Sequence, residues 1–148
     1  MNIRLMTADD YERVFELWIN TPGMGLNNLD DSREGIEKFL ARNPGTCFVA
    51  EAEGALAGVI MSGHDTRRGY IYHMAVERGG QRQGTGEALL NAALAALKSE
   101  GITRVSLLVF RDNEKGNAFW EKQGFKVRED VLHRSKDLIE TVRINTLN

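Results

Sequence analysis

One segment of the chain places four glycines within eight residues, between an apolar run and a long run of helix-forming residues. The apolar run covers residues 70–76, the glycines are at positions 79, 80, 84 and 86, and the Ala- and Leu-rich run covers residues 84–100. Glycine lets backbone N–H groups approach a bound oxyanion closely. The start of a helix adds unpaired N–H groups and the positive end of the helix dipole. The segment therefore predicts a phosphate- or pyrophosphate-binding turn, or else a glycine-rich strand-to-helix turn without a ligand.

Two common phosphate-binding motifs do not fit this turn. A P-loop requires Gly-Lys followed by Ser or Thr, and the chain contains no such sequence. A dinucleotide-binding fingerprint would need its third glycine at position 89, which is Leu89. The pattern that remains is Gln-x-x-Gly-x-Gly at Gln81, Gly84 and Gly86, after a strand expected to end at Val76.

Composition indicates an ordinary globular protein. The 148 residues fit a single domain, 1–148, and the 42% of hydrophobic residues suffice for a core. A formal net charge of −2 provides no overall field to attract nucleic acid or an anionic membrane, so neither is an expected partner. The single cysteine, Cys47, allows neither an intrachain disulfide nor a thiolate-rich zinc site, so a reducing compartment and no metal are expected.

The sequence also favours a cytoplasmic protein. The acidic pair Asp9-Asp10 lies where a secretory signal would need an apolar run. No stretch approaches the roughly 18 apolar residues that a membrane-spanning helix requires.

Hydrophobic spacing predicts a mixed α/β (α+β) fold, with helices on both faces of a central sheet of about six or seven strands. A strand, helix, strand passage over residues 70–110 predicts one parallel pair, and the other strands are expected to pair antiparallel. The expected strands are 3–5, 47–50, 56–61, 70–76, 105–110, 125–129 and 132–138, and the expected helices are 11–20, 32–42, 84–100 and 113–123.

The last residues, 139–148, fit more than one role. The apolar spacing of Ile139, Val142, Ile144 and Leu147 suits a contact in a homodimer. It equally suits a strand or helix added to the same chain, so this segment is treated as a possible C-terminal extension.

The glycine-rich turn and a second motif together resemble the GNAT superfamily of acetyl-CoA-dependent N-acetyltransferases. The second motif consists of Asn113, Gly116, the aromatic pair Phe119-Trp120 and Gly124-Phe125. It is similar to the family pattern of Asn-x-x-Ala, an aromatic pair and Gly-Phe, and the order of elements corresponds over essentially the whole chain. The resemblance implies transfer of an acetyl group from acetyl-CoA to a primary amine of a small molecule, peptide or protein, by direct attack on the thioester.

The resemblance also implies which residues bind the cosubstrate. Two parallel strands are expected to separate at their carboxyl ends, so that backbone groups near Met74 to Val76 bind the pantetheine arm and the thioester oxygen while the turn binds the pyrophosphate. The expected cofactor-binding residues are Met74, Ala75, Val76, Gln81, Arg82, Gln83, Gly84, Thr85, Gly86, Asn113, Gly116 and Trp120.

Proton transfer is where the sequence departs from the family. Some relatives place a polar base five residues before the motif asparagine, and that position here is Leu108, which cannot accept a proton. Tyr70 and Tyr72 match positions that order a catalytic water in the family, and alternation along a strand puts both on one face. His73 is chemically the better base but is expected on the opposite face unless a bulge intervenes. Each of the three also reads as an ordinary packing or structural residue.

Trp120 is a second departure, because many relatives have a tyrosine there that protonates the departing thiolate. Trp120 either packs against the CoA arm or belongs to the core. Together with Leu108 it motivates an alternative function, a CoA-binding sensor or interaction module with little turnover.

The acceptor amine is not identified by the sequence. The resemblance puts the loops 22–31 and 64–69 at the acceptor entrance. Asp30, Asp31 and Asp65 there would attract a cationic amine, whereas Arg67 and Arg68 would favour a carboxylated one. A solvated charged loop is the simpler interpretation of each.

Overall fold

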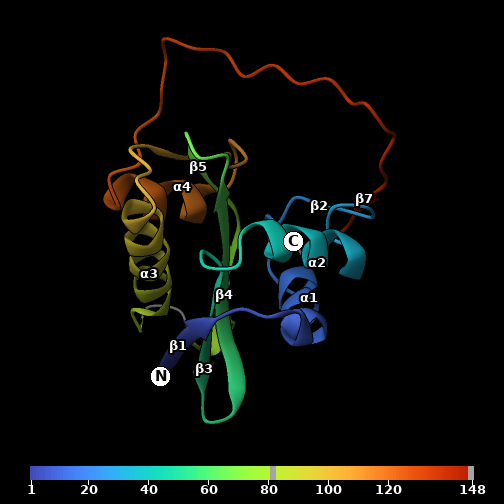
Figure 1. The fold of residues 1–148 in the computed structure, drawn as a ribbon, viewed down its shortest axis with the longest axis vertical. Coiled ribbons are helices and arrows are strands. Elements are labelled where there is room, and N and C mark those ends of the chain that lie inside the picture. The colour runs from blue at the N-terminus through green and yellow to red at the C-terminus, as the bar shows by residue number, and fades with distance from the viewer. Residues whose placement is uncertain (81–82, 147–148) are drawn as a thin grey trace.

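The computed structural model describes residues 1–80 and 83–146 and contains seven strands in two sheets (Figure 1). The larger sheet has the order β1-β3-β4-β5-β6. Its strands are β1 (Asn2–Leu5), β3 (Phe48–Ala52), β4 (Ala55–His64), β5 (Gly69–Val76) and β6 (Val105–Leu107). The smaller sheet pairs β2 (Leu26–Asn27) with β7 (Arg143–Ile144). The mixed α/β fold predicted from the sequence is confirmed.

Helices cover both faces of the larger sheet (Figure 1). On one face lie α1 (Tyr11–Ile19) and α2 (Arg33–Arg42); on the other lie α3 (Thr85–Ser99) and α4 (Glu114–Lys122). Short 3₁₀ turns, Ala8–Asp10 and Arg78–Gly80, precede α1 and α3. None of the helices in the described part of the chain is long and apolar enough to cross a bilayer.

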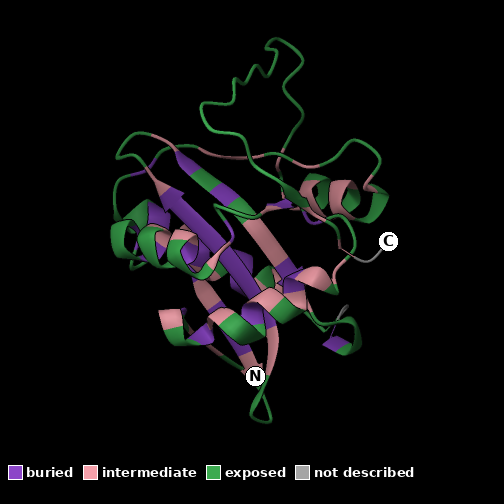
Figure 2. Cartoon of the chain, turned by 90° about the vertical axis from the view of Figure 1, so that its right-hand side faces the viewer, coloured by how far each residue is buried: buried purple, intermediate pink, exposed green. Residues whose placement is uncertain are grey.

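Alternating residues of β4 connect the two halves of the core. Val59 packs into the cluster under α1 and α2, which contains the fully buried Trp18. Its neighbour Ile60 packs into the cluster under α3, with Leu89. A strand buried on both faces has no polar side, which is why residues 56–61 form a nearly continuous apolar run. Figure 2 shows that the central strands of this sheet are largely buried.

An ion-pair network ties the first strand to the first helix. Arg4 on β1 donates to both carboxylate oxygens of Asp10, at 2.9 and 2.8 Å, and to Glu51 on β3, at 2.7 Å. Burial alone raises the pKa of the Asp10 carboxyl, but hydrogen bonds from Arg4, Thr7 and Arg13 outweigh it and lower the pKa to about 2. Asp10 therefore carries its charge at neutral pH and holds β1, β3 and α1 together.

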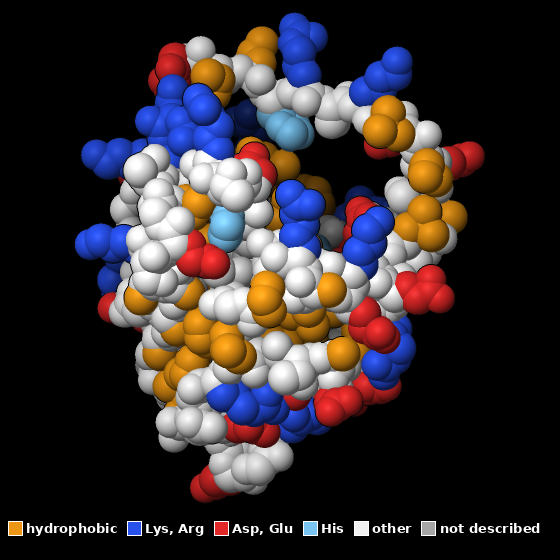
Figure 3. Space-filling model, viewed as in Figure 1, with side chains coloured by type: hydrophobic (Ala, Val, Ile, Leu, Met, Phe, Trp, Pro, Cys, Tyr) orange, Lys and Arg blue, Asp and Glu red, His pale blue; other side chains and the backbone are white. Residues whose placement is uncertain are grey.

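The chain after α4 differs from the prediction. Residues 125–129 and 132–138 form no strands, so these two expected strands are wrong. The segment stands away from the rest of the molecule, as the space-filling view makes plain (Figures 1 and 3). Val127, Leu132 and Leu138 on it are 76%, 80% and 91% exposed. Apolar alternation produces a strand only where a neighbouring strand pairs with it, and this segment has no such partner among the described residues.

The small sheet resolves part of the question about the C-terminal extension. Ile144 pairs with Leu26, and Arg143 with Asn27, so this part of the extension adds a strand on the same chain. Its partner, β2, lies within the predicted loop 22–31. Ile144 also packs against the cluster under α1 and α2. Leu147, the last residue of the predicted apolar spacing, lies outside the described residues.

Candidate functional site

Strand β5 carries six of the predicted site residues, and its pairing with its parallel neighbour is partial. The ladder between β5 and β6 runs from Gly69 opposite Val105 to Ile71 opposite Leu107, whereas β5 itself continues to Val76. On its other side, β5 pairs with β4 along its whole length. The ladder therefore covers the whole of β6 but only the amino end of β5, which agrees with the separation at the carboxyl ends that the resemblance implied.

A bulge in β5 reorients the predicted catalytic residues. Along β4, Met61 lies opposite His73, but the next residue lies opposite Ile71, so Tyr72 is the extra residue. Such an insertion shifts the alternation of side chains by one residue. The ring of Tyr72 consequently packs against Phe39 of α2, with 5.4 Å between the ring centroids. The ring of His73 packs against Trp18 of α1, with 4.8 Å between the centroids, so both side chains lie on the α1–α2 face.

The bulge brings all three predicted catalytic residues to one face. The ring centroids of Tyr70 and Tyr72 lie 5.9 Å apart. The side chains of these two tyrosines are exposed, whereas that of His73 is mostly buried. In an unbroken strand, the side chain of His73 would point to the face opposite to Tyr70 and Tyr72. The bulge turns it to the same face instead. Burial raises the pKa of Tyr72, and the negative charges of Tyr70, Asp65 and Asp30 add to the shift. Tyr72 is therefore a neutral hydroxyl at physiological pH and can donate a hydrogen bond.

His73 is paired with an acidic residue from the loop between α1 and α2. Its Nε2 lies 2.7 Å from Oδ1 of Asp31, whose side chain is 3% exposed. The interpretation of Asp31 as part of a solvated charged loop is therefore wrong. The two residues are 42 positions apart in the chain, and no local pattern marks the pairing.

The other charged loop residues have local roles or lie at the surface. The Asp65 carboxylate accepts the backbone N–H groups of Arg67 and Arg68, at 2.9 and 2.7 Å, and so closes the turn before β5. Asp30 is exposed and accepts the side-chain amide of Asn27 at 2.9 Å.

Gly84 is the residue of the glycine-rich turn whose backbone requires glycine. It precedes α3 with φ +80°, a left-handed conformation that costs other residues roughly 1–2 kcal/mol. A Cβ added there would meet no atom within 4 Å. The backbone N–H groups that open the fifteen-residue helix α3 lie beside this open space. The turn thus fits an anionic group such as a pyrophosphate.

Other residues of the turn contribute differently from the prediction. The buried hydroxyl of Thr85 donates to the sulfur of Met1 at 3.2 Å, and the Gln83 amide donates to the carbonyl of Gly79 at 3.1 Å. A Cβ on Gly86 would lie 3.6 Å from the side chains of Met74, Val76 and Phe119. These are ordinary contact distances, so the packing of α3 on β5 and α4 leaves room for a Cβ at position 86. Gln81 and Arg82 lie outside the described residues.

Met74 and Ala75 point their side chains into opposite halves of the core. Met74 packs with the cluster under α3, and Ala75, which is 3% exposed, packs with the cluster under α1 and α2. Only their backbone groups can therefore face a ligand lying along the edge of β5.

The second motif has a clear structural basis. Asn113 precedes α4 and its side-chain oxygen accepts the N–H of Gly116 at 2.9 Å, which caps the helix. A Cβ on Gly116 would lie 2.6 Å from the Asn113 amide nitrogen, so a larger residue there would have to shift the Asn113 side chain. Trp120 packs edge-on against Phe119 and Phe125, with 5.0 and 5.2 Å between the ring centroids. These contacts support the interpretation of Trp120 as a core residue. Contacts of these residues with a cosubstrate remain predictions.

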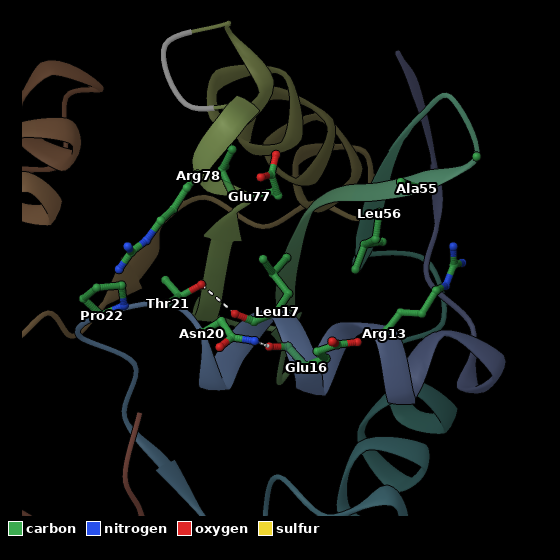
Figure 4. Close-up of a pocket in the computed structure, with 12 residues that line it drawn as sticks. Arg13, Glu16, Leu17, Asn20, Thr21, Pro22, Ala55, Leu56, Glu77 and Arg78 are labelled. Atoms are coloured by element: carbon green, nitrogen blue, oxygen red, sulfur yellow. Dashed lines mark hydrogen bonds between the residues drawn. The ribbon is translucent and has the colours of Figure 1, made fainter. Parts of the chain in front are cut away.

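The structure also contains a pocket that the sequence did not predict. Its volume is about 470 Å³, and it lies between α1, the β3–β4 turn and the end of β5 (Figure 4). Arg78 reaches across its mouth toward Pro22. The lining residues are Arg13, Glu16, Leu17, Asn20, Thr21, Pro22, Gly54, Ala55, Leu56, Val76, Glu77 and Arg78. Among the predicted cofactor-binding residues, only Val76 lines it. Within the described residues, no three His, Cys, Asp or Glu side chains form a candidate metal site.

Comparisons with known proteins agree with this geometry. The Acetyltransferase (GNAT) family profile matches residues 11–125. An acetyltransferase of Sodalis glossinidius (strain morsitans) is 32% identical over 140 residues, which cover 95% of this chain and 97% of that protein. An acetyltransferase of Yersinia pestis (strain Pestoides F) is 28% identical over 132 residues, which cover 89% and 92%.

Solved structures share the fold. The PaiA N-acetyltransferase of Thermoplasma acidophilum, solved with coenzyme A, superposes with a TM-score of 0.77 at 22% identity, over 88% of this chain and 92% of that chain. Ard1 of Thermoplasma volcanium superposes with a TM-score of 0.76 at 23% identity, over 86% of this chain and 83% of that chain. Family profile, sequence relatives and fold agree over most of the chain. The chain belongs to the GNAT family of acetyltransferases, enzymes that use acetyl-CoA.

Proposed function

We propose that this acetyltransferase transfers the acetyl group to a primary amine of a small molecule, peptide or protein. One observation carries the proposal: β5 continues past the end of its ladder with β6, beside the amino end of α3. That arrangement offers a strand edge for an extended arm and a helix start for an anion, within one short stretch of chain.

The chain's own residues divide the task of holding acetyl-CoA, which supplies the acetyl group as a thioester. The backbone N–H groups at the start of α3 and the open space at Gly84 suit the pyrophosphate. The edge of β5 from Tyr72 to Ala75 suits the pantetheine arm, because the amide groups of the arm can form hydrogen bonds with the backbone of β5 as a neighbouring strand would. A backbone N–H of this edge would also stabilise negative charge on the thioester oxygen, which is worth about 3 kcal/mol in other enzymes.

Direct attack by the amine is favoured over an acetylated enzyme. Cys47 is the only cysteine in the sequence, and it is 1% exposed. Burial raises the pKa of its thiol to about 12, despite the hydrogen bond that it donates to the carbonyl of Ser62. A buried, protonated thiol cannot serve as the nucleophile of a two-step transfer.

Proton removal is required because an alkylammonium with a pKa of about 10.4 is almost fully protonated at neutral pH. The ammonium loses one proton to a group on the enzyme, and its nitrogen then bonds to the thioester carbon. The C–S bond breaks with its electron pair on sulfur, and a second proton leaves the nitrogen and neutralises the thiolate. His73, and water ordered by Tyr70 and Tyr72, are the candidates for the first step, since all three side chains share one face of β5.

The test is thiol release from acetyl-CoA in the presence of primary amines. Spermidine, lysine, ethanolamine and a peptide with a free α-amino group cover the main acceptor classes, and mass spectrometry identifies the acetylated product. We expect many equivalents of thiol per enzyme with at least one of these amines, above the rate without an amine. Acetyl-CoA binding by calorimetry without amine-dependent thiol release would instead indicate the alternative, a sensor with little turnover.

A further inference from the structure

The contact between His73 and Asp31 goes beyond what the resemblance implies. His73 is the residue directly after the bulge in β5, and Asp31 comes from the loop before α2. The distance between Nε2 and Oδ1, 2.7 Å, is that of a strong hydrogen bond to a charged acceptor. Both side chains are shielded, with 11% and 3% of their surface exposed.

The Asp31 carboxylate is itself fixed in place. Its second oxygen, Oδ2, accepts the backbone N–H of Asn27 at 2.8 Å, at the end of β2. Its backbone carbonyl accepts the hydroxyl of Tyr11 on α1 at 2.8 Å. Asp31 is therefore held by β2 through its carboxylate and by α1 through its backbone, and both of its carboxylate oxygens have a partner.

This contact determines which ring nitrogen of the neutral His73 imidazole carries the hydrogen. A carboxylate can only accept, so Nε2 carries the hydrogen and Nδ1 carries the lone pair. Trp18 packs edge-on against the ring, and within the described residues Asp31 is the one ion-pair partner of the ring. Nδ1 makes no hydrogen bond to the described part of the chain, so it is available to a ligand or a water molecule.

We propose that Asp31 is a positioning residue for His73, which accepts the proton of the acceptor ammonium at Nδ1. The proposal rests on the proposed function. Asp31 fixes the tautomer and the ring orientation, and its charge stabilises the imidazolium that forms when the proton arrives. The proton then passes to solvent, which returns His73 to its neutral form.

The kinetic test is a double-mutant cycle with Asp31→Asn and His73→Gln, using the best amine of the panel above. We expect His73→Gln to lower kcat about 100-fold and Asp31→Asn about 10-fold or more, with little change in the KM for acetyl-CoA. The double variant should match His73→Gln alone, because Asp31 acts through His73. Glu34→Gln is the matched control: it removes an exposed carboxylate three positions further along and should leave kcat within about twofold.

Independent multiplication of the two effects would contradict the proposal, since it would mean that Asp31 only supports the fold. Wild-type kcat in Asp31→Asn would contradict it as well. Absence of turnover by the wild type on every amine would instead refute the proposed function.

Nitrogen NMR of the imidazole side chains provides a readout that does not require turnover. The three histidines of the sequence are assigned by comparison with His73→Gln. In the wild type at a pH where His73 is neutral, we expect a single tautomer with the proton on Nε2, and in Asp31→Asn a mixture of tautomers or the other one. A wild-type spectrum with the proton on Nδ1, or with averaged tautomers, would overturn the proposal.

Discussion

Replacement of Gly84 by aspartate is expected to weaken the binding of acetyl-CoA about 100-fold or more, as measured by calorimetry. The aspartate side chain would enter the open space at the start of α3 and put a negative charge where the pyrophosphate is proposed to bind. Loss of charge-assisted hydrogen bonds costs about 1.5–3 kcal/mol, and each 1.4 kcal/mol is about tenfold in affinity. Gly84→Asn has nearly the same shape without the charge and should lose less.

Gly101 provides a matched control at the other end of the same helix. Its φ of +83° is close to the +80° of Gly84, and a Cβ at either position would meet no atom within 4 Å. Gly101→Asp therefore carries similar backbone strain, but at a site far from the proposed pyrophosphate. It should change the affinity by about twofold or less. Equal losses of affinity in the two variants would show that strain in α3, rather than the site, is responsible.

Gly35→Ala is expected to destabilise the protein by about 2 kcal/mol in urea unfolding, although alanine normally favours a helix by about 1 kcal/mol over glycine. Gly35 lies in the first turn of α2, and its N–H caps the helix by donating to Ser32 at 3.0 Å. A Cβ there would press against the backbone carbonyls of Leu29 and Asp30, well inside contact distance. Backbone atoms cannot rotate away, so the loop that carries Asp31 would have to move.

Gly45→Ala is the control for this change. A Cβ at Gly45 would meet no atom within 4 Å, and the residue does not have a positive φ. Alanine leaves the unfolded chain fewer conformations than glycine does. Gly45→Ala should therefore leave the free energy of unfolding unchanged or raise it by about 0.4–1 kcal/mol. If Gly35→Ala were as stable as Gly45→Ala, the close approach of α2 to the preceding loop would not matter for folding.

Elements defined by local spacing were predictable from the sequence. The α3 helix, which covers Thr85–Ser99, and the antiparallel pair of β3 and β4 follow from residues within one turn or one strand of each other, and both predictions are confirmed. The cap of α4 by Asn113 is equally local. In these segments the intrinsic preferences of the residues and their tertiary contacts agree.

Features that depend on distant residues were not predictable. Strand β2 exists because Leu26 pairs with Ile144; the apolar spacing around Ile144 allowed an added strand, but no pattern identified Leu26 as its partner. The bulge at Tyr72 depends on the register with β4. Apolar alternation at residues 125–138 predicted strands that need a pairing partner, and none forms there. Periodicity reports which face of a segment is apolar but not which segment will pair with it.

The candidate site combines both kinds of feature. The helix start at Gly84 and the motif asparagine at 113 could be found from the sequence, because glycine and capping residues leave local signals. The Asp31–His73 pair could not, since a loop and a strand bring these residues together. If the proposed role of His73 holds, the face of β5 supplies the proton acceptor, and position 108 does not need to carry a base.

The most direct test of this account is a crystal structure of the protein with bound coenzyme A. We expect the pyrophosphate oxygens against the backbone N–H groups at residues 84–86, and the thiol between the carboxyl half of β5 and the start of α4. Coenzyme A in the pocket lined by Arg13, Leu17 and Leu56, with no phosphate near Gly84, would contradict it.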